Sequence, residues 1–292
     1  MTADLPVLSI ETIKAGLRWA EGPVPYAGGI VFSDIPNDVL HLWRDGEVTV
    51  FRSPSHQANG NTTDKSGRLV TCDHLTRSVT RTEVDGSLSV LATHWQGRRL
   101  NSPNDVVVAP DGAVWFTDPP YMLLNGGAPS DYLQEIDFAG VYRIDPATGT
   151  VELMIDVLDK PNGLAMTPDG ARLYVSDTGY SQRSGGNHHV FRFEMRSGRP
   201  REMSVFAEIS PGACDGLRID AAGMIWVTSG EGAQCLGVNG EVIGRLDVGE
   251  MGTNLCFLEG EHPGIFLTTP TRALAVIVDD AGHSPGFARR AQ

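Results

Sequence analysis

Oxygen-bearing side chains recur at one place in a phrase that the chain repeats six times. The phrases begin at Glu21, Asn59, Asn104, Asn162, Asp215 and Asn254. These leading residues are carboxylates or carboxamides, and none of them is a cysteine or a histidine. Carboxylate and amide oxygens are the ligands that Ca²⁺, Mg²⁺ and Mn²⁺ prefer. If the positions converge in space, they can hold a divalent cation, which would relieve the repulsion between the acids.

Only part of this set is predicted to bind the metal, namely Glu21, Asn104, Asn162 and Asp215. Asn59 is left out because Asn61 competes for the same position, and Asn254 because its phrase matches the repeat loosely. A single Asn-Gly or Asp-Gly dipeptide indicates only a turn, since both are strong turn formers. Here the polar residue lies at the same position of a repeated phrase, and only two of the phrases have an acid there. This pattern favours a binding site over simple turns.

Each phrase predicts a β-hairpin. In the first five phrases a glycine follows the leading residue by eight positions, and the residues around it form two short strands and a tight turn. Ala113–Asp118 and Arg172–Asp177 are two of the predicted second strands. Four phrases also have a glycine directly after the leading residue, which indicates backbone that approaches a neighbour closely or adopts positive φ. Asp118 and the acids at equivalent strand ends are interpreted as turn formers.

The spacing of the phrases predicts the architecture. Successive leading residues are 38 to 58 positions apart, which suits four short strands per repeat and matches the length of a propeller blade. We therefore expect an all-β fold in which residues 1–292 form a single six-bladed β-propeller domain with a central metal-binding tunnel. Equivalent positions of successive blades surround one axis, so the leading residues should meet there. Val7–Thr12 and Ala273–Asp279 should pair in one sheet and close the ring.

Charge and hydropathy restrict the partners. The chain has a formal net charge of −13 and a pI near 5.0, which argues against nucleic acid and anionic membranes. A small molecule is therefore the expected partner. No segment approaches the roughly 20 apolar residues that span a bilayer, and the first residues lack a basic region followed by an apolar stretch. A cytoplasmic location is expected, and the oligomeric state is left open.

Four motifs carry a resemblance to a known family. The phrases WAEGP, RRLNSPNDVVVAPDGAVWFTDPPY, KPNGLAMTPDGARLYVSDT and CDGLRID resemble the SMP-30/gluconolactonase/luciferin-regenerating-enzyme family, over a stretch from about Leu17 to Thr269. The resemblance implies a six-bladed propeller with one divalent cation in its tunnel and metal-dependent hydrolysis of sugar lactones or similar esters. Ca²⁺ is the preferred cation, with Zn²⁺, Mn²⁺ and Mg²⁺ as alternatives. A small-molecule lactone is the implied substrate.

The resemblance also implies roles for individual residues. Glu21, Asn162 and Asp215 match the metal ligands of the family, and Asn104 matches an asparagine that ligates the metal or orients substrate. An arginine just before this asparagine binds substrate in the family. The spacing from arginine to asparagine differs from that of the animal members, so either Arg98 or Arg99 could have this role. Arg99 is preferred.

A mechanism follows from these roles. The cation would polarise the lactone carbonyl, and Asp215 would assist the attack of water as the catalytic base. Tyr121, after a rigid Pro-Pro step, is assigned to substrate binding at the tunnel mouth. No GxSxG, HExxH or GxxxxGK[ST] motif offers another chemistry. For His74, which follows a strand end, a core or surface role is favoured over a place in the pocket.

Two alternatives stay open. The same metal and fold could serve an esterase or phosphotriesterase, because one propeller geometry accepts different leaving groups. The chain could also be a non-catalytic binding module in which the metal is structural.

Overall fold

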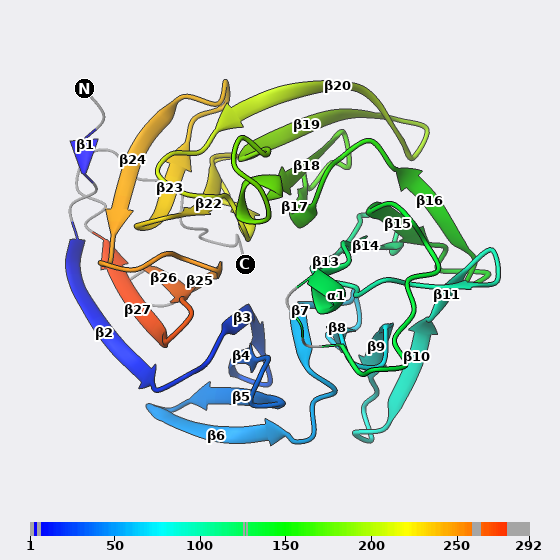
Figure 1. Cartoon of the computed structure of the whole chain (residues 1–292). Helices are drawn as coiled ribbons and strands as arrows, with labels where there is room; N and C mark the ends of the chain where they lie inside the picture. Colours follow the sequence, from blue (N-terminus) through cyan, green and yellow to red (C-terminus); the bar gives the residue numbers. More distant parts are fainter. Residues whose placement is uncertain (1–2, 5–6, 125, 127, 259–263, 279–292) are drawn as a thin grey trace.

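The computed structural model is a six-bladed β-propeller, as predicted from the repeat (Figure 1). It describes residues 3–4, 7–124, 126, 128–258 and 264–278. In each blade four strands run antiparallel, and the innermost strands contact one another around a common axis. The all-β fold class is therefore confirmed. The assignment of residues 1–292 to one domain stays a prediction.

The first three blades follow the chain from the axis outward. Blade 1 consists of β3 (Ala20–Tyr26), β4 (Gly29–Asp34), β5 (Val39–Arg44) and β6 (Glu47–Arg52). Blade 2 consists of β7 (Ala58–Thr63), β8 (Leu69–Asp73), β9 (Ser78–Thr82) and β10 (Leu88–Ala92). Blade 3 consists of β13 (Val106–Val108), β14 (Val114–Asp118), β15 (Gly140–Ile144) and β16 (Val151–Ile155). A small hairpin, β11 (His94–Trp95) and β12 (Arg98–Arg99), joins blades 2 and 3.

The last three blades repeat this order. Blade 4 consists of β17 (Pro161–Met166), β18 (Arg172–Asp177), β19 (His189–Arg196) and β20 (Arg199–Glu208). Blade 5 consists of β21 (Leu217–Ile219), β22 (Ile225–Ser229), β23 (Gly232–Leu236) and β24 (Val242–Asp247), with β1 (Ala3–Asp4) parallel to β24. Blade 6 consists of β25 (Asn254–Leu258), β26 (Gly264–Thr268), β27 (Arg272–Val278) and β2 (Val7–Ala15). Among the described residues, two short helices, α1 (Tyr121–Leu124) and η1 (Gly179–Ser181), lie in loops.

Strand β2 closes the ring. It pairs antiparallel with β27, so that Val7 lies opposite Val278 and Thr12 opposite Leu274. The prediction that the two terminal strands share one sheet is confirmed. Asp279, the last residue of the predicted strand, lies outside the described residues.

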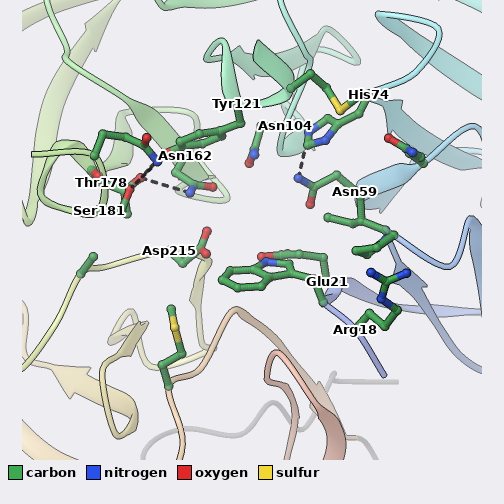
Figure 2. A pocket seen from close by; sticks show the side chains of 18 residues that line it. Arg18, Glu21, Asn59, His74, Asn104, Tyr121, Asn162, Thr178, Ser181 and Asp215 are labelled. Atoms are coloured by element: carbon green, nitrogen blue, oxygen red, sulfur yellow. Dashed lines mark hydrogen bonds between the residues drawn. The ribbon is translucent and has the colours of Figure 1, made fainter. Parts of the chain in front are cut away.

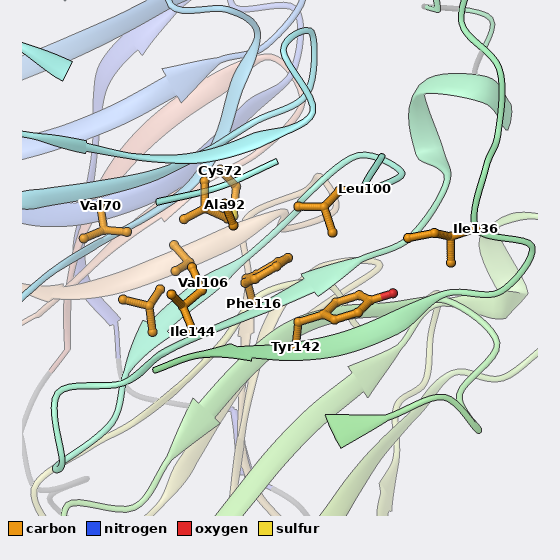
Figure 3. Close-up of a cluster of buried hydrophobic side chains, with 11 residues drawn as sticks. Val70, Cys72, Ala92, Leu100, Val106, Phe116, Ile136, Tyr142 and Ile144 are labelled. Atoms are coloured by element: carbon orange, nitrogen blue, oxygen red, sulfur yellow. The ribbon is translucent and has the colours of Figure 1, made fainter. Parts of the chain in front are cut away.

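The core consists of six apolar clusters, one between each pair of neighbouring blades. Figure 3 shows the cluster between blades 2 and 3, where Phe116 of β14 packs with Tyr142. The residue before Phe116 cannot face the same cluster, because side chains of a strand alternate between its two faces. Trp115 accordingly enters the cluster between blades 3 and 4. Burial of both faces explains why these strands are almost continuously apolar.

The four cysteines are free and buried, as expected for core positions in a reduced chain. Within the described ranges, the structure contains no helix of the length and apolar character that crossing a membrane requires. The cytoplasmic location stays a prediction.

Candidate active site

A cavity of about 670 Å³ opens at the propeller axis. This volume is typical of sites that bind small molecules. All four predicted metal ligands line the cavity and are at least nine-tenths buried: Glu21, Asn104, Asn162 and Asp215. Figure 2 shows their side chains converging from different blades. The structure therefore brings the predicted ring together, as expected for equivalent positions around one axis.

Local backbone irregularities point these residues at the axis. The pairing of β3 shifts register just after Glu21, and the pairing of β17 shifts register around Asn162. Such β-bulges bend a strand and redirect its side chains, and they are frequent beside active sites. Asn104 and Asp215 instead lie just ahead of β13 and β21, where the chain enters the inner strand.

The glycines that follow the leading residues allow neighbouring blades to approach. A Cβ atom at Gly163 would lie 2.4 Å from the carbonyl oxygen of Asp215, and one at Gly216 would lie 2.2 Å from Oδ1 of Asn254. Gly22 is equally close to the next blade and also adopts a φ of +50°. The predicted close approach is confirmed. Each of these glycines makes room for the leading residue of the next blade.

Hydroxyl groups of the second strands fix the leading residues in place. Hydrogen bonds to the carbonyl oxygens run from Ser33 to Asn59 at 2.6 Å, from Thr117 to Asn162 at 2.7 Å and from Ser176 to Asp215 at 2.6 Å. These donors were not among the residues predicted from the sequence. A signal was present, because each hydroxyl residue directly precedes the acid at its strand end.

Strand-end acids order the loops that enter blades 3 and 4. Asp177 accepts hydrogen bonds from the backbone nitrogens of Asp159 and Lys160, and Asp118 accepts one from the backbone nitrogen of Asn101. The interpretation of Asp118 as a turn-forming residue agrees with this placement.

The two acids of the ring are costly to ionise. Oε2 of Glu21 accepts hydrogen bonds from the backbone nitrogen of Gly22 at 2.8 Å and from Nδ2 of Asn254 at 2.9 Å. Burial, reinforced by the Asp105 carboxylate, raises the pKa of Glu21 to about 7. Burial, together with the charges of Glu21 and Asp105, raises the pKa of Asp215 well above its ordinary value. A nearby cation would reverse these shifts, because an opposite charge favours the ionised form.

Thr178 orients the amide of Asn162. Nδ2 of Asn162 donates a hydrogen bond to Oγ1 of Thr178 at 3.1 Å, and the same hydroxyl lies 2.6 Å from the Tyr121 hydroxyl. Because Nδ2 is held in this way, Oδ1 of Asn162 is the amide atom left to ligate a cation. Tyr121 lines the cavity as predicted for a substrate contact, but its hydroxyl is hydrogen-bonded to Thr178.

The predicted substrate-binding arginine lies elsewhere. Neither Arg98 nor Arg99 lines the cavity, because the β11–β12 hairpin that carries them packs against β16, the outermost strand of blade 3. Nη2 of Arg99 donates a hydrogen bond to the carbonyl oxygen of Thr76 at 2.8 Å. The arginine that lines the cavity is Arg18, which the sequence analysis overlooked although it precedes Glu21 by only three positions.

Asn59 and His74 also line the cavity. Nδ2 of Asn59 lies 3.0 Å from Nε2 of His74. From the sequence, Asn59 was not predicted to bind the metal, and a core or surface role was favoured for His74. Both side chains are buried, yet both face the space around which the acids are arranged.

The donor set fits a hard divalent cation only if amide oxygens contribute. Across the described residues, no group of three or more His, Cys, Asp and Glu side chains could hold a metal. Two carboxylates and the amide oxygens of Asn104 and Asn162 can serve Ca²⁺ or Mg²⁺, which prefer oxygen. A third buried acid, Asp105, is paired with Arg218 at 3.3 Å. Glu21 and Asp215 are then the acids whose charge one divalent ion would balance.

Fold and site together define a class: β-propellers with an oxygen-lined small-molecule cavity on the axis. Residues 19–271 match the family described as the SMP-30/gluconolactonase/LRE-like region. The chain belongs to this family, which confirms the resemblance seen in the four motifs.

Relatives agree with this membership. A gluconolactonase of Zymomonas mobilis is 32% identical to this chain over 277 residues, covering 86% of this chain and 76% of the relative. The pentonolactonase XacC of Haloferax volcanii is 28% identical over 269 residues, covering 88% and 83%. Among solved structures, a gluconolactonase from Xanthomonas campestris superposes with a TM-score of 0.85 at 32% identity, over 95% of this chain and 96% of that one.

Proposed function

We propose that this chain is a metal-dependent lactonase that hydrolyses a sugar lactone, such as an aldonolactone, in the axial cavity. The observation that carries the proposal is the pair of buried acids, Glu21 and Asp215, which meet amide oxygens in a cavity of small-molecule size. Relatives named gluconolactonase and pentonolactonase support the substrate class.

The residues proposed to hold the cation are Glu21, Asn104, Asn162 and Asp215. Ca²⁺ is the favoured ion because the set is entirely oxygen. When bound, the cation would polarise the lactone carbonyl and stabilise the negative charge that develops on its oxygen. The chain's own contribution is to hold the ligands in place. Asn254 fixes one oxygen of Glu21, and Thr178 fixes the nitrogen of Asn162.

Asp215 is the proposed catalytic base. Its carboxylate accepts a proton from the water that attacks the carbonyl carbon, the ring C–O bond then breaks, and the proton passes to the departing alkoxide. The products are a hydroxyl group and a carboxylic acid in one open chain. The bound cation would favour the ionised form of Asp215, which is the form that can accept a proton. General-base assistance of this kind contributes about 10²–10⁴-fold to a rate.

Asn104 and Arg18 are the proposed substrate contacts. The side-chain amide of Asn104 makes no hydrogen bond to any described residue, so its polar atoms are available to a ligand in the cavity. Arg18 lines the same cavity and is exposed. On this placement Arg18, and not Arg99, is the arginine proposed to meet substrate oxygens.

Proton release from a panel of lactones tests the proposal. Purified protein is stripped of metal and resupplied with Ca²⁺, Zn²⁺, Mn²⁺ or Mg²⁺, and glucono-1,5-lactone, aliphatic lactones, an aryl ester and a phosphotriester are compared. We expect lactone hydrolysis above the spontaneous rate that disappears with chelator and returns with one cation. Folded Asp215→Asn protein should lose the activity. Activity on the aryl ester or phosphotriester alone would contradict the lactonase assignment.

A further inference from the structure

Asn59 carries a buried oxygen that nothing in the described part of the chain satisfies. The side chain is 4% exposed, and its Oδ1 has no hydrogen-bond partner among the described residues. A buried acceptor without a partner costs about 1–3 kcal/mol. Asn59 lines the axial cavity, so a donor that enters the cavity is placed to supply the missing bond.

His74 sets the orientation of this amide. Nε2 of His74 lies 3.0 Å from Nδ2 of Asn59, so the imidazole nitrogen accepts a hydrogen bond from the amide and Oδ1 is the atom left over. A protonated imidazole could not accept this bond, because both of its nitrogens are donors. Burial lowers the pKa of His74 to about 4, which keeps the ring neutral at physiological pH. His74 is therefore a positioning residue for Asn59.

The pair lies beside the proposed metal site. A Cβ atom at Gly22, the residue after Glu21, would lie 2.2 Å from the backbone oxygen of Asn59, so the two leading residues are immediate neighbours on blades 1 and 2. In Figure 2 the Asn59 amide and Glu21 lie on the same side of the cavity, across from Thr178 and Asn162. If the carbonyl of a lactone faces the cation that the acids would hold, a ring substituent can face Asn59 on the same side of the cavity.

The substituent that fits is a hydroxyl group. Oδ1 of an amide accepts hydrogen bonds and cannot donate them. Glu21, the leading residue of the neighbouring blade, is an acid that lines the same cavity, and its charge disfavours an anionic substituent. A methylene group would leave the oxygen unpaired, and a site built to bond a substrate hydroxyl rejects an analogue that lacks it far more strongly than an apolar pocket does.

We propose that Asn59, held by His74, binds a ring hydroxyl of the substrate and makes the enzyme selective for polyhydroxylated lactones over aliphatic ones. This inference rests on the proposed lactonase function. It adds a specificity site that the metal-binding residues do not provide.

The test compares two substrates on each protein preparation. The measured quantity is the ratio of kcat/KM for glucono-1,5-lactone to kcat/KM for δ-valerolactone, which has the same ring without hydroxyl groups. The ratio does not depend on the fraction of protein that is folded, so partial unfolding of a core variant does not affect it. The variants are Asn59→Ala and His74→Phe. The matched controls are Asn239→Ala and His94→Phe, the same residue types at exposed positions away from the cavity.

We expect Asn59→Ala to lower the ratio at least about tenfold, which corresponds to one hydrogen bond of about 1.4 kcal/mol. His74→Phe should lower it in the same direction, and both controls should keep the wild-type ratio. Ca²⁺ affinity, measured by calorimetry, should be unchanged in Asn59→Ala.

A wild-type ratio in Asn59→Ala would overturn the inference while leaving the lactonase function intact. If this ratio comes with an equal loss on both lactones and weaker Ca²⁺ binding, Asn59 is a metal ligand. If the wild-type protein hydrolyses neither lactone, the proposed function is wrong, and the proposed hydroxyl subsite is wrong with it.

Discussion

Arg218 and the buried Asp105 form an ion pair that joins blade 5 to blade 3, with Nη1 of the arginine 3.3 Å from Oδ2 of the acid. Asp105 is 1% exposed and directly follows Asn104 of the proposed metal site. Its charge contributes to the raised pKa of both Glu21 and Asp215, while Arg218 opposes the rise at Glu21. Arg218 thus acts as a cation built into the chain, which offsets one of three neighbouring acids.

Replacing Arg218 by methionine should destabilise the protein by about 3 kcal/mol, because Asp105 would then be a buried charge without a partner. The measurement is urea unfolding in the presence of chelator, so that metal binding does not contribute. The double variant Arg218→Met/Asp105→Asn should recover most of the loss. A single variant as stable as the wild type would show that Asp105 does not depend on this partner.

The hydrogen bond from Asn162 to Thr178 leads to a second prediction. Thr178→Val keeps the shape of the side chain but removes the acceptor that holds Nδ2 of Asn162. Substitution of a residue that orients a metal ligand typically lowers metal affinity 10- to 100-fold. We therefore expect the Ca²⁺ affinity, measured by calorimetry, to fall about tenfold. Thr178→Ser retains the hydroxyl and should bind Ca²⁺ like the wild type. Equal affinities in all three proteins would argue against Asn162 as a ligand held by Thr178.

The fold and the acids of the site could be predicted because the repeat carries both. A recurring hairpin phrase determines the blade, and the closed ring brings equivalent positions such as Glu21 and Asp215 to one axis although 194 positions separate them. The symmetry of the propeller alone predicts that these positions meet. The terminal pairing of β2 with β27 could be predicted for the same reason, since an open ring would leave unpaired strand edges.

Features outside the repeat could not be predicted in this way. Arg99 lies in an insertion between blades, where the register of the repeat places no constraint, and its hairpin packs at the outer strand of blade 3. The pair of Asp105 and Arg218 is separated by 113 positions and has no spacing signature. The role of Asn59 depends on one hydrogen bond to His74, which only side-chain geometry reveals.

Gly163 offers a test of how tightly the blades pack around Asp215. In Gly163→Ala the added Cβ would lie 2.4 Å from the Asp215 carbonyl oxygen, so backbone must move. We expect a loss of about 3 kcal/mol in the free energy of unfolding, and lower lactonase activity in the protein that remains folded. Gly149→Ala is the control, because its Cβ would meet open space and only its φ of +69° is unfavourable, at a cost of about 1 kcal/mol. Equal losses in both variants would contradict the packing argument.

Asp118 should make stability depend on pH. Burial raises its pKa from the ordinary 3.8 to about 7, although the backbone nitrogen of Asn101 donates a hydrogen bond to it. The folded state therefore binds a proton more tightly than the unfolded state. This contribution to stability is complete below the unfolded pKa and is lost as the pH rises through the folded pKa. At about 1.4 kcal/mol per pKa unit, the loss is at most about 4 kcal/mol.

Urea unfolding of Asp118→Asn at pH 5, 6, 7 and 8 measures this contribution. The variant should lose less stability than the wild type between pH 5 and 8, since an amide does not titrate. Asp145→Asn is the matched control, because hydrogen bonds lower the pKa of Asp145 to about 2 and the group is ionised throughout this window in both states. Its pH dependence should equal that of the wild type. If Asp118→Asn also follows the wild-type pH dependence, then Asp118 is already ionised at pH 5 in the folded protein, and its buried charge must be stabilised by a group other than Asn101.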